Sequence, residues 1–137
     1  ANLCRAVVES ATYGLRYGLD LFRRQGITAR EIRLTGGGAR SPRWRQIVAD
    51  VTGCPVVCLK VNETAALGGA IQAMWATALA DDPHQQAESV LSDLCRRFVS
   101  LDESSRAEPD AERQAQYDAL YQRYLQRLQQ AYPEVSL

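Results

Sequence analysis

The chain has 137 residues and a formal net charge of zero, with 46% hydrophobic and 23% charged residues. This length suits one domain with a modest core, and the composition is that of an ordinary globular protein. The balanced charge lacks the positive field typical of nucleic-acid-binding proteins, so no nucleic-acid partner is expected. No apolar run reaches membrane-spanning length and no signal peptide is recognisable, which predicts a cytoplasmic protein without membrane contact.

The charge distribution indicates a kind of ligand, and the cysteine spacing indicates whether the thiols are free. Residues 1–60 hold ten Lys/Arg and four Asp/Glu, whereas residues 61–137 hold six and twelve. A basic first half suits a phosphorylated ligand, although two solvated faces of opposite charge give the same counts. The four cysteines form no CxxC pair and His84 is the only histidine. The sequence therefore predicts reduced thiols and no metal site.

The first half of the chain predicts helices that alternate with strands. Apolar residues recur at helical spacing over residues 3–25 and again after Ser41-Pro42, where the expected helix ends at Thr52-Gly53. Short β-rich runs predict strands over about 31–35 and 55–59, and a helix rich in small residues follows the second strand. Because a helix lies between the two strands, we expect a parallel pair joined by a right-handed crossover. The predicted fold class is α/β.

The second half is more polar and predicts mainly helix. A helix near residues 84–98 and another over about 111–131 flank an acidic loop at 100–110. Tyrosines at helical spacing in the last helix are more typical of packing than of a cofactor site, so this helix is expected to dock against the body. We therefore expect a helical extension over residues 81–137 behind an α/β part over residues 1–80.

Three consecutive glycines, Gly36 to Gly38, separate the first expected strand from the helix that begins at Ser41-Pro42. Glycines permit positive φ angles and close approach of a ligand, and helix amino termini attract anions. A tight turn without a ligand explains the same residues. Two common phosphate-binding templates fail, because Gly-Lys-Ser/Thr is absent and Ser41 stands where the dinucleotide template needs its third glycine.

Two motifs resemble the C-terminal nucleotide-binding domain of FGGY-type carbohydrate kinases. The first is Leu-Thr-Gly-Gly-Gly-Ala-Arg-Ser-Pro-Arg-Trp-Arg-Gln-Ile-Val-Ala-Asp-Val-Thr-Gly at residues 34–53, and the second is Glu-Thr-Ala-Ala-Leu-Gly-Gly-Ala at residues 63–70. The expected helix is also similar at residues 3–10, and the resemblance covers about residues 3–80. Within the family, the xylulose-phosphorylating members are the most similar.

This resemblance implies part of a ribonuclease-H-like domain of the actin-like ATPase architecture, in which ATP lies in the cleft between two such domains. It implies that residues 1–80 are the ATP-binding part and that ATP, with Mg²⁺, is the cofactor. The implied nucleotide contacts are Gly36, Gly37, Gly38 and Ala39, with Ser41 where some members have Asn. Weaker contacts are implied at Arg40, Glu63, Thr64 and Gly68, and helix capping and packing are the alternative for the last three.

The resemblance places the catalytic base, the sugar contacts and most Mg²⁺ ligands in an N-terminal domain that is absent from this sequence. The sequence also begins with Ala1 rather than Met, so we expect a piece of a longer chain. Asp50, Asp81 and Asp82 match no catalytic motif, and no catalytic residue is assigned. The intact enzyme is expected to phosphorylate D-xylulose with ATP, whereas this chain alone is expected to be inactive.

Two parallel strands make a small sheet with unpaired edges. The strand at residues 31–35 is therefore expected to pair with residues outside this chain, or with a second copy in a homodimer. Two alternatives to the kinase remain open. One is a non-catalytic nucleotide-binding module of the actin-like superfamily, and the other is an α/β interaction domain whose glycines are purely structural.

Overall fold

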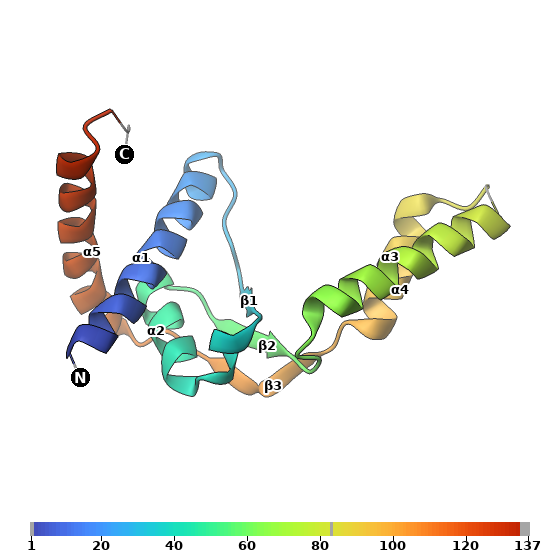
Figure 1. Ribbon diagram of the computed structural model, residues 1–137, viewed down its shortest axis with the longest axis horizontal. Helices are drawn as coiled ribbons and strands as arrows, with labels where there is room; N and C mark the ends of the chain where they lie inside the picture. Colours follow the sequence, from blue (N-terminus) through green and yellow to red (C-terminus); the bar gives the residue numbers. More distant parts are fainter. Residues whose placement is uncertain (1, 83, 135–137) are drawn as a thin grey trace.

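The computed structural model describes residues 2–82 and 84–134. Helices α1, α2 and α5 gather on one side of a small sheet, whereas α3 and α4 lie side by side and project away from it (Figure 1). The elements in chain order are α1 (Asn2–Arg24), β1 (Ile32–Leu34), the 3₁₀ turn η1 (Gly37–Arg40), α2 (Pro42–Thr52), β2 (Val56–Leu59), α3 (Thr64–Asp81), α4 (Ala87–Phe98), β3 (Leu101–Ala107) and α5 (Ala111–Ala131).

Local signals in the sequence account for the ends of α2. The helix begins where predicted, because the Ser41 hydroxyl oxygen accepts a hydrogen bond from the Trp44 N–H at 3.3 Å and Pro42 fills the first helical position. It ends at Gly53, whose φ of 66° is left-handed. The other predicted helices and both predicted strands are likewise confirmed, close to their expected ends.

The sheet has three strands in the order β1-β2-β3. Strand β1 pairs with β2 in parallel, as predicted, with Ile32 opposite Val56 and Leu34 opposite Cys58. Strand β3 pairs antiparallel with the other edge of β2, and Leu101 lies opposite Leu59. Both edges of β2 are therefore paired, and β1 and β3 are the outer strands.

The acidic loop predicted for residues 100–110 is wrong, because Leu101–Ala107 forms β3. Only Ser105 and Ala107 of this strand are buried, so its sequence lacks the apolar alternation that identifies a half-buried strand. Where the register shifts between Val56 and Cys58, the Ser105 hydroxyl oxygen accepts a hydrogen bond from the Cys58 N–H at 2.8 Å. The segment expected to be a purely helical extension thus adds a strand to the sheet.

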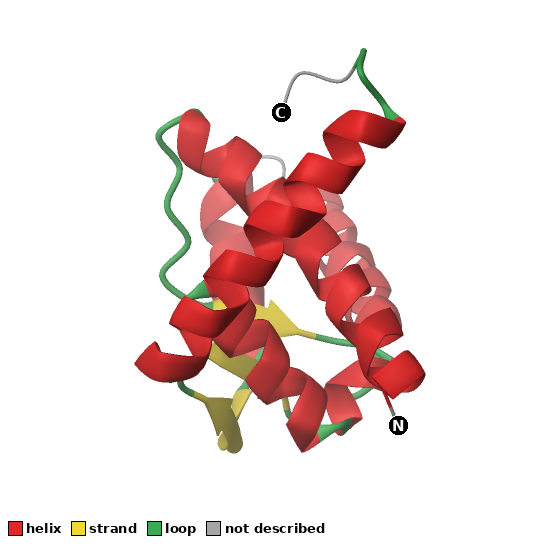
Figure 2. Ribbon diagram, turned by 90° about the vertical axis from the view of Figure 1, so that its left-hand side faces the viewer, coloured by secondary structure: helices red, strands yellow, loops and turns green. Residues whose placement is uncertain are grey.

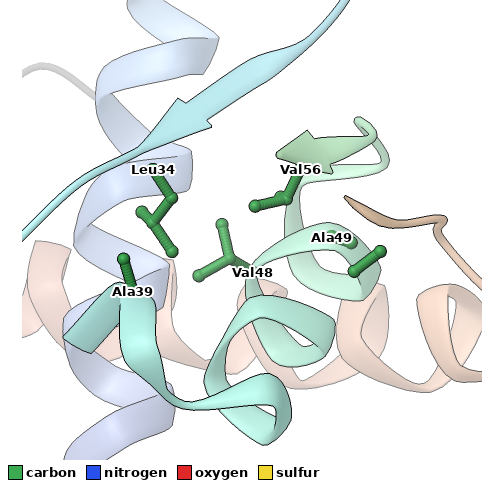
Figure 3. Packing of buried hydrophobic residues seen from close by; sticks show 6 residues of the cluster. Leu34, Ala39, Val48, Ala49 and Val56 are labelled. Carbon is green, nitrogen blue, oxygen red and sulfur yellow. The ribbon is translucent and has the colours of Figure 1, made fainter. Parts of the chain in front are cut away.

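The main core lies between α2 and the sheet. Val48 and Ala49 of α2 pack with Leu34 of β1 and Val56 of β2, and the Ala39 methyl group joins them from the glycine turn (Figure 3). The exposed fractions of Val48 and Val56 are 1% and 0%. Full burial of one such side chain stabilises a fold by about 1.5–3 kcal/mol, so this cluster fixes α2 on the sheet.

Tyrosines hold α5 against α1, as the sequence predicts. The Tyr13 ring of α1 lies near the rings of Tyr117, Tyr121 and Tyr124 of α5, at centroid distances of 6.4, 6.0 and 5.6 Å. The Arg16 guanidinium lies 4.2 Å from the centroid of the Tyr121 ring, a cation–π contact. Viewed from the side on which α5 lies, α5 and α1 stand in front of the strands (Figure 2).

Helices α3 and α4 form a hairpin in which the indole N–H of Trp75 donates to the Ala87 carbonyl oxygen at 2.9 Å. The sequence predicts a narrow face of small residues on α3 for tight packing. No described atom outside α3 lies within 4 Å of a Cβ built on Gly68 or Gly69, so these glycines face open space.

Within residues 2–82 and 84–134, no helix combines the length and apolarity needed to cross a bilayer.

The backbone N–H groups on the outer edge of β1 show where a further strand could pair with the sheet. The Ile32 N–H donates to the Pro55 carbonyl oxygen of the β2 side at 2.8 Å. Successive N–H groups of a strand point to opposite sides, so the Arg33 N–H points away from β2. A hollow of about 570 Å³ lies beside this strand and is also lined by Gly14 and Gly18 of α1.

We predict that the Arg33 amide exchanges with deuterium much faster than the Ile32 amide in the monomeric chain. The Ile32 N–H is hydrogen-bonded to the β2 side of the sheet, whereas the Arg33 N–H points away from it. Residue-resolved hydrogen exchange by NMR measures both rates. Slowing of Arg33 exchange in a longer form of the protein, or on dimerisation, supports the missing partner strand. Strong protection of Arg33 in a proven monomer contradicts it.

The tyrosine cluster predicts a loss of stability in alkaline solution. Burial, with contributions from Glu9 and Tyr117, raises the pKa of Tyr13 to about 12, and burial also raises the pKa of Tyr117 and of Tyr121. Unfolded tyrosines ionise near pH 10, so the stabilisation is complete below about pH 10 and is lost as the pH rises toward about 12. Urea titrations across this range measure the loss.

Tyr13→Phe is the matched variant for this prediction. The Tyr13 hydroxyl is buried without a hydrogen-bond partner among the described residues, so its removal should leave stability at neutral pH unchanged or raised. The alkaline loss of stability should become smaller. Tyr132→Phe, at an exposed position, is the control and should leave the pH profile unchanged. An alkaline loss of the same size in Tyr13→Phe contradicts the prediction.

Candidate functional site

A cavity of about 330 Å³ lies at the carboxyl ends of the parallel strands β1 and β2. Open α/β sheets bind ligands at this edge, outside the carboxyl ends of their strands. The glycine turn, the end of β2 with its following loop, and β3 contribute the walls. Lining residues from these segments and from α2 and α3 include Thr35, Gly36, Ala39, Arg40, Arg45, Cys58, Lys60, Asn62, Thr64, Asp102 and Ser105.

The three glycines of the turn differ in what the fold demands of them. Gly36 has a φ of 86°, a conformation that L side chains rarely adopt. A Cβ at Gly38 would collide with the ring of Trp44, which is itself held by a 3.2 Å hydrogen bond from its indole N–H to the Thr12 hydroxyl. Gly37 has neither constraint, since its φ is not positive and a Cβ there meets open space.

Free backbone donors lie along the glycine turn. The Ala39 N–H donates to the Gly36 carbonyl oxygen at 3.1 Å, and the Ser41 N–H donates to the Gly38 carbonyl oxygen at 2.9 Å. Among the described residues, no group accepts a hydrogen bond from the N–H of Gly36, Gly37 or Gly38. Unsatisfied amides in such a turn suit a phosphate or another anion.

Positive side chains line the cavity without carboxylate partners. Arg40, Arg45 and Lys60 contribute three positive charges, and none of them forms an ion pair with a described carboxylate. Asp102 is the acidic residue of the lining, and its Oδ1 accepts hydrogen bonds from the Ser104 N–H at 3.1 Å and the Ser104 hydroxyl at 2.6 Å. The excess of positive charge favours an anionic ligand.

The structure brings some of the sequence-predicted contact residues into the cavity wall and leaves others beside it. Those that line the cavity are Gly36, Ala39, Arg40 and Thr64. Those outside its lining are Gly37, Gly38, Ser41, Glu63 and Gly68.

The residues outside the lining have identifiable places in the fold. Gly37 and Gly38 belong to η1, and Ser41 caps α2. Glu63 precedes α3 as an exposed residue whose side chain makes no capping hydrogen bond. Gly68 lies within α3, with open space where its side chain would be.

Several lining residues were missed from the sequence. Lys60 and Asn62 follow β2 directly, so the rule that ligands bind at the carboxyl ends of parallel strands could have found them. Asp102 and Ser105 had no signal, because their strand was expected to be a loop. Arg45 could not be distinguished from the other arginines at the start of α2 without the course of the backbone.

A metal centre has little support in the described part of the chain. No group of three or more His, Cys, Asp or Glu side chains in residues 2–82 and 84–134 is arranged to hold a metal ion. Cys54 is buried and Cys58 is half-buried, and both are free thiols.

The glycine turn and the helices around it are shared with a known family. The model of the C-terminal domain of the FGGY family of carbohydrate kinases matches residues 1–77. The chain belongs to this family. The resemblance of the glycine turn and of the Glu63–Ala70 motif to FGGY kinases is thereby confirmed.

Xylulose kinases are among the similar FGGY sequences. The xylulose kinase of Haemophilus influenzae is 53% identical over 96% of this chain, and that of Escherichia coli K12 is 33% identical over 96%. The matched region is 25% of each of these relatives. This FGGY chain therefore spans about a quarter of the length of the curated relatives it matches.

Solved kinase structures share the fold of this FGGY chain. A xylulose kinase from Rhodospirillum rubrum superimposes with a TM-score of 0.71 and 27% identity, over 96% of this chain and 25% of that one. A gluconate kinase from Lactobacillus acidophilus superimposes with a TM-score of 0.72 and 25% sequence identity. The match covers 94% of this chain and 24% of that one. The expected class, part of a ribonuclease-H-like domain of the actin-like ATPase type, is confirmed.

Because a Cβ would collide with Trp44 at Gly38 but meets open space at Gly37, substitution of these two glycines should change the stability by different amounts. Gly38→Ala should lower the free energy of unfolding by about 1–3 kcal/mol, because the new methyl group must displace the held Trp44 ring. Gly37→Ala should stay within about 0.5 kcal/mol of the parent chain, because its Cβ meets open space. Denaturant unfolding measures both variants, and equal losses of stability contradict this description of the turn.

Proposed function

We propose that this chain is the ATP-binding C-terminal portion of a sugar kinase. The intact enzyme transfers the γ-phosphoryl group of ATP to D-xylulose and forms ADP and D-xylulose 5-phosphate. The observation that carries the proposal is the cavity at the ends of β1 and β2, which is lined by Gly36 of the glycine turn and by three cations without described carboxylate partners, Arg40, Arg45 and Lys60. The similarity to xylulose kinases supports the choice of sugar.

In this proposal the glycine turn binds the nucleotide through its backbone. Gly36, Gly37 and Gly38 supply free N–H groups and Ala39 and Ser41 complete the contact. The weaker contacts are Arg40, Glu63, Thr64 and Gly68, of which Arg40 and Thr64 line the cavity. Such donors fit a phosphate group, and residues 1–80 form the ATP-binding part together with the wall that β3 adds.

The chemistry itself is proposed to depend on parts of the enzyme outside this chain. Phosphoryl transfer needs in-line positioning and Mg²⁺ to neutralise developing charge. The described residues hold no carboxylate cluster for the metal, so the proposal assigns Mg²⁺, the sugar and the catalytic base mainly to an N-terminal domain. The intact enzyme is proposed to act in the cytoplasm, and this chain alone is proposed to be inactive.

A non-catalytic nucleotide-binding or interaction module is the second candidate function. The observation that favours it is structural, since Gly36 is required by its φ of 86° and Gly38 by the Trp44 ring. Two of the three glycines thus have a role without any ligand. Gly37 separates the candidates, because the fold makes no demand on its side chain.

We predict that the chain binds ATP and that Gly37→Val weakens this binding by at least tenfold, because the added side chain stands between the turn and the phosphates. Isothermal titration calorimetry measures the affinity. Gly69→Val is the matched control, because Gly69 also has open space at its Cβ but lies within α3, away from the glycine turn. Unchanged affinity in Gly37→Val contradicts the site assignment.

The same preparation tests whether phosphoryl transfer needs an N-terminal domain in addition to this chain. With ATP, Mg²⁺ and D-xylulose, this chain alone should form no ADP above the background hydrolysis. A longer form that includes an N-terminal domain should form ADP and D-xylulose 5-phosphate together. Turnover by this chain alone contradicts the assignment of the catalytic base to another domain, and a longer form that binds ATP without turnover favours the non-catalytic module.

A further inference from the structure

Two side chains from different elements converge on one carbonyl group of the glycine turn. The Arg45 Nη1 of α2 donates to the Ala39 carbonyl oxygen at 2.8 Å. The Cys58 thiol of β2 donates to the same oxygen at 3.6 Å. We propose that Arg45 is a positioning residue that fixes the glycine turn for an anionic ligand, an inference that rests on the proposed ATP site.

Ala39 is held at both its methyl group and its carbonyl group. The methyl group is buried in the core beside Leu34 and Val48, and the exposed fraction of Ala39 is only 7% (Figure 3). The carbonyl oxygen accepts hydrogen bonds from both Arg45 and Cys58. The end of the turn is therefore fixed to α2 and β2, the two elements that carry the core.

The hydrogen bonds of the turn leave it with donors for a ligand and few acceptors. The carbonyl oxygens of Gly36 and Gly38 accept from the N–H groups of Ala39 and Ser41, and the Ala39 carbonyl oxygen accepts from Arg45. The N–H groups of Gly36, Gly37 and Gly38 have no described acceptor. A carbonyl oxygen in the wall of an anion site repels the ligand unless a donor occupies it, and Arg45 is that donor.

Arg40 is the internal comparison for this role. It lines the same cavity and carries the same charge as Arg45, but its guanidinium donates to no other described residue. A residue that acts only through long-range charge affects ATP binding without affecting the turn. A positioning residue also affects the rigidity of the turn when no ligand is bound. The two roles are therefore separated by a measurement on the free protein.

The test compares Arg45→Met and Arg45→Lys with Arg40→Met. The first readout is amide exchange at Ala39 and Ser41, whose N–H groups close the turn. The second is ATP affinity by titration calorimetry. Arg45→Met should speed exchange at both amides by roughly tenfold or more and weaken ATP binding by a similar factor, as expected for loss of a hydrogen bond to a charged donor. Arg45→Lys should restore these values in part.

Arg40→Met should weaken ATP binding less and leave both exchange rates at their parent values. Equal weakening of ATP binding by Arg45→Met and Arg40→Met, with exchange unchanged in both, overturns the inference and makes Arg45 a simple charge. If Arg45→Met does not fold, the shorter and neutral variant Arg45→Gln is measured instead, and parent-like exchange at Ala39 and Ser41 in that variant overturns the inference.

If the proposed ATP site is wrong, the experiments give a different result from the one expected if the role of Arg45 is wrong. A parent chain that does not bind ATP at all contradicts the ATP site, but the exchange measurement needs no ligand. In that case faster exchange at Ala39 and Ser41 in Arg45→Met still supports the role of Arg45 in fixing the turn, and unchanged exchange overturns it. The two hypotheses are therefore tested separately.

Discussion

Burial of α2 between the sheet and the tyrosine helices is the constraint on which the rest of the structure depends. Val48 and Ala49 enter the core over the sheet, whereas Val51 packs among the tyrosines of α1 and α5. A short helix that is buried in two directions has no freedom to shift. Because η1 leads directly into the first turn of α2, fixing the helix also fixes the glycine turn that forms the cavity wall.

An ion pair between the buried Asp50 side chain and the half-exposed Arg113 makes α5 part of the same arrangement. The Asp50 side chain is 2% exposed, and it accepts hydrogen bonds from the Arg113 guanidinium at 2.6 Å and the Asp110 N–H at 2.9 Å. The Gln46 amide also donates to Asp50, at 2.9 Å, so the desolvation of this carboxylate is offset by several donors. Asp50, which matches no catalytic motif, thus has a structural role that holds the start of α5 to α2.

The chemistry of the cavity follows from this packing. The carbonyl oxygens of Gly36, Gly38 and Ala39 accept hydrogen bonds, whereas the N–H groups of Gly36 to Gly38 have no described acceptor. Lys60 and Arg40 add positive charge to the cavity wall. These features describe a site that attracts an anion. This FGGY chain spans about a quarter of the length of the xylulose kinases that it matches.

The sequence by itself determined the helices, the two parallel strands and the glycine turn, because caps such as Ser41 and Gly53 and apolar periodicity act over a few residues. The family was also readable, since its motifs lie within short segments. Only the tertiary structure decided that Leu101–Ala107 is a strand, because its pairing partner lies some forty residues away along the chain and its own side chains are mostly polar. The same applies to Arg45 and Asp102, which line one cavity only because packing of α2 and pairing of β3 bring their segments together.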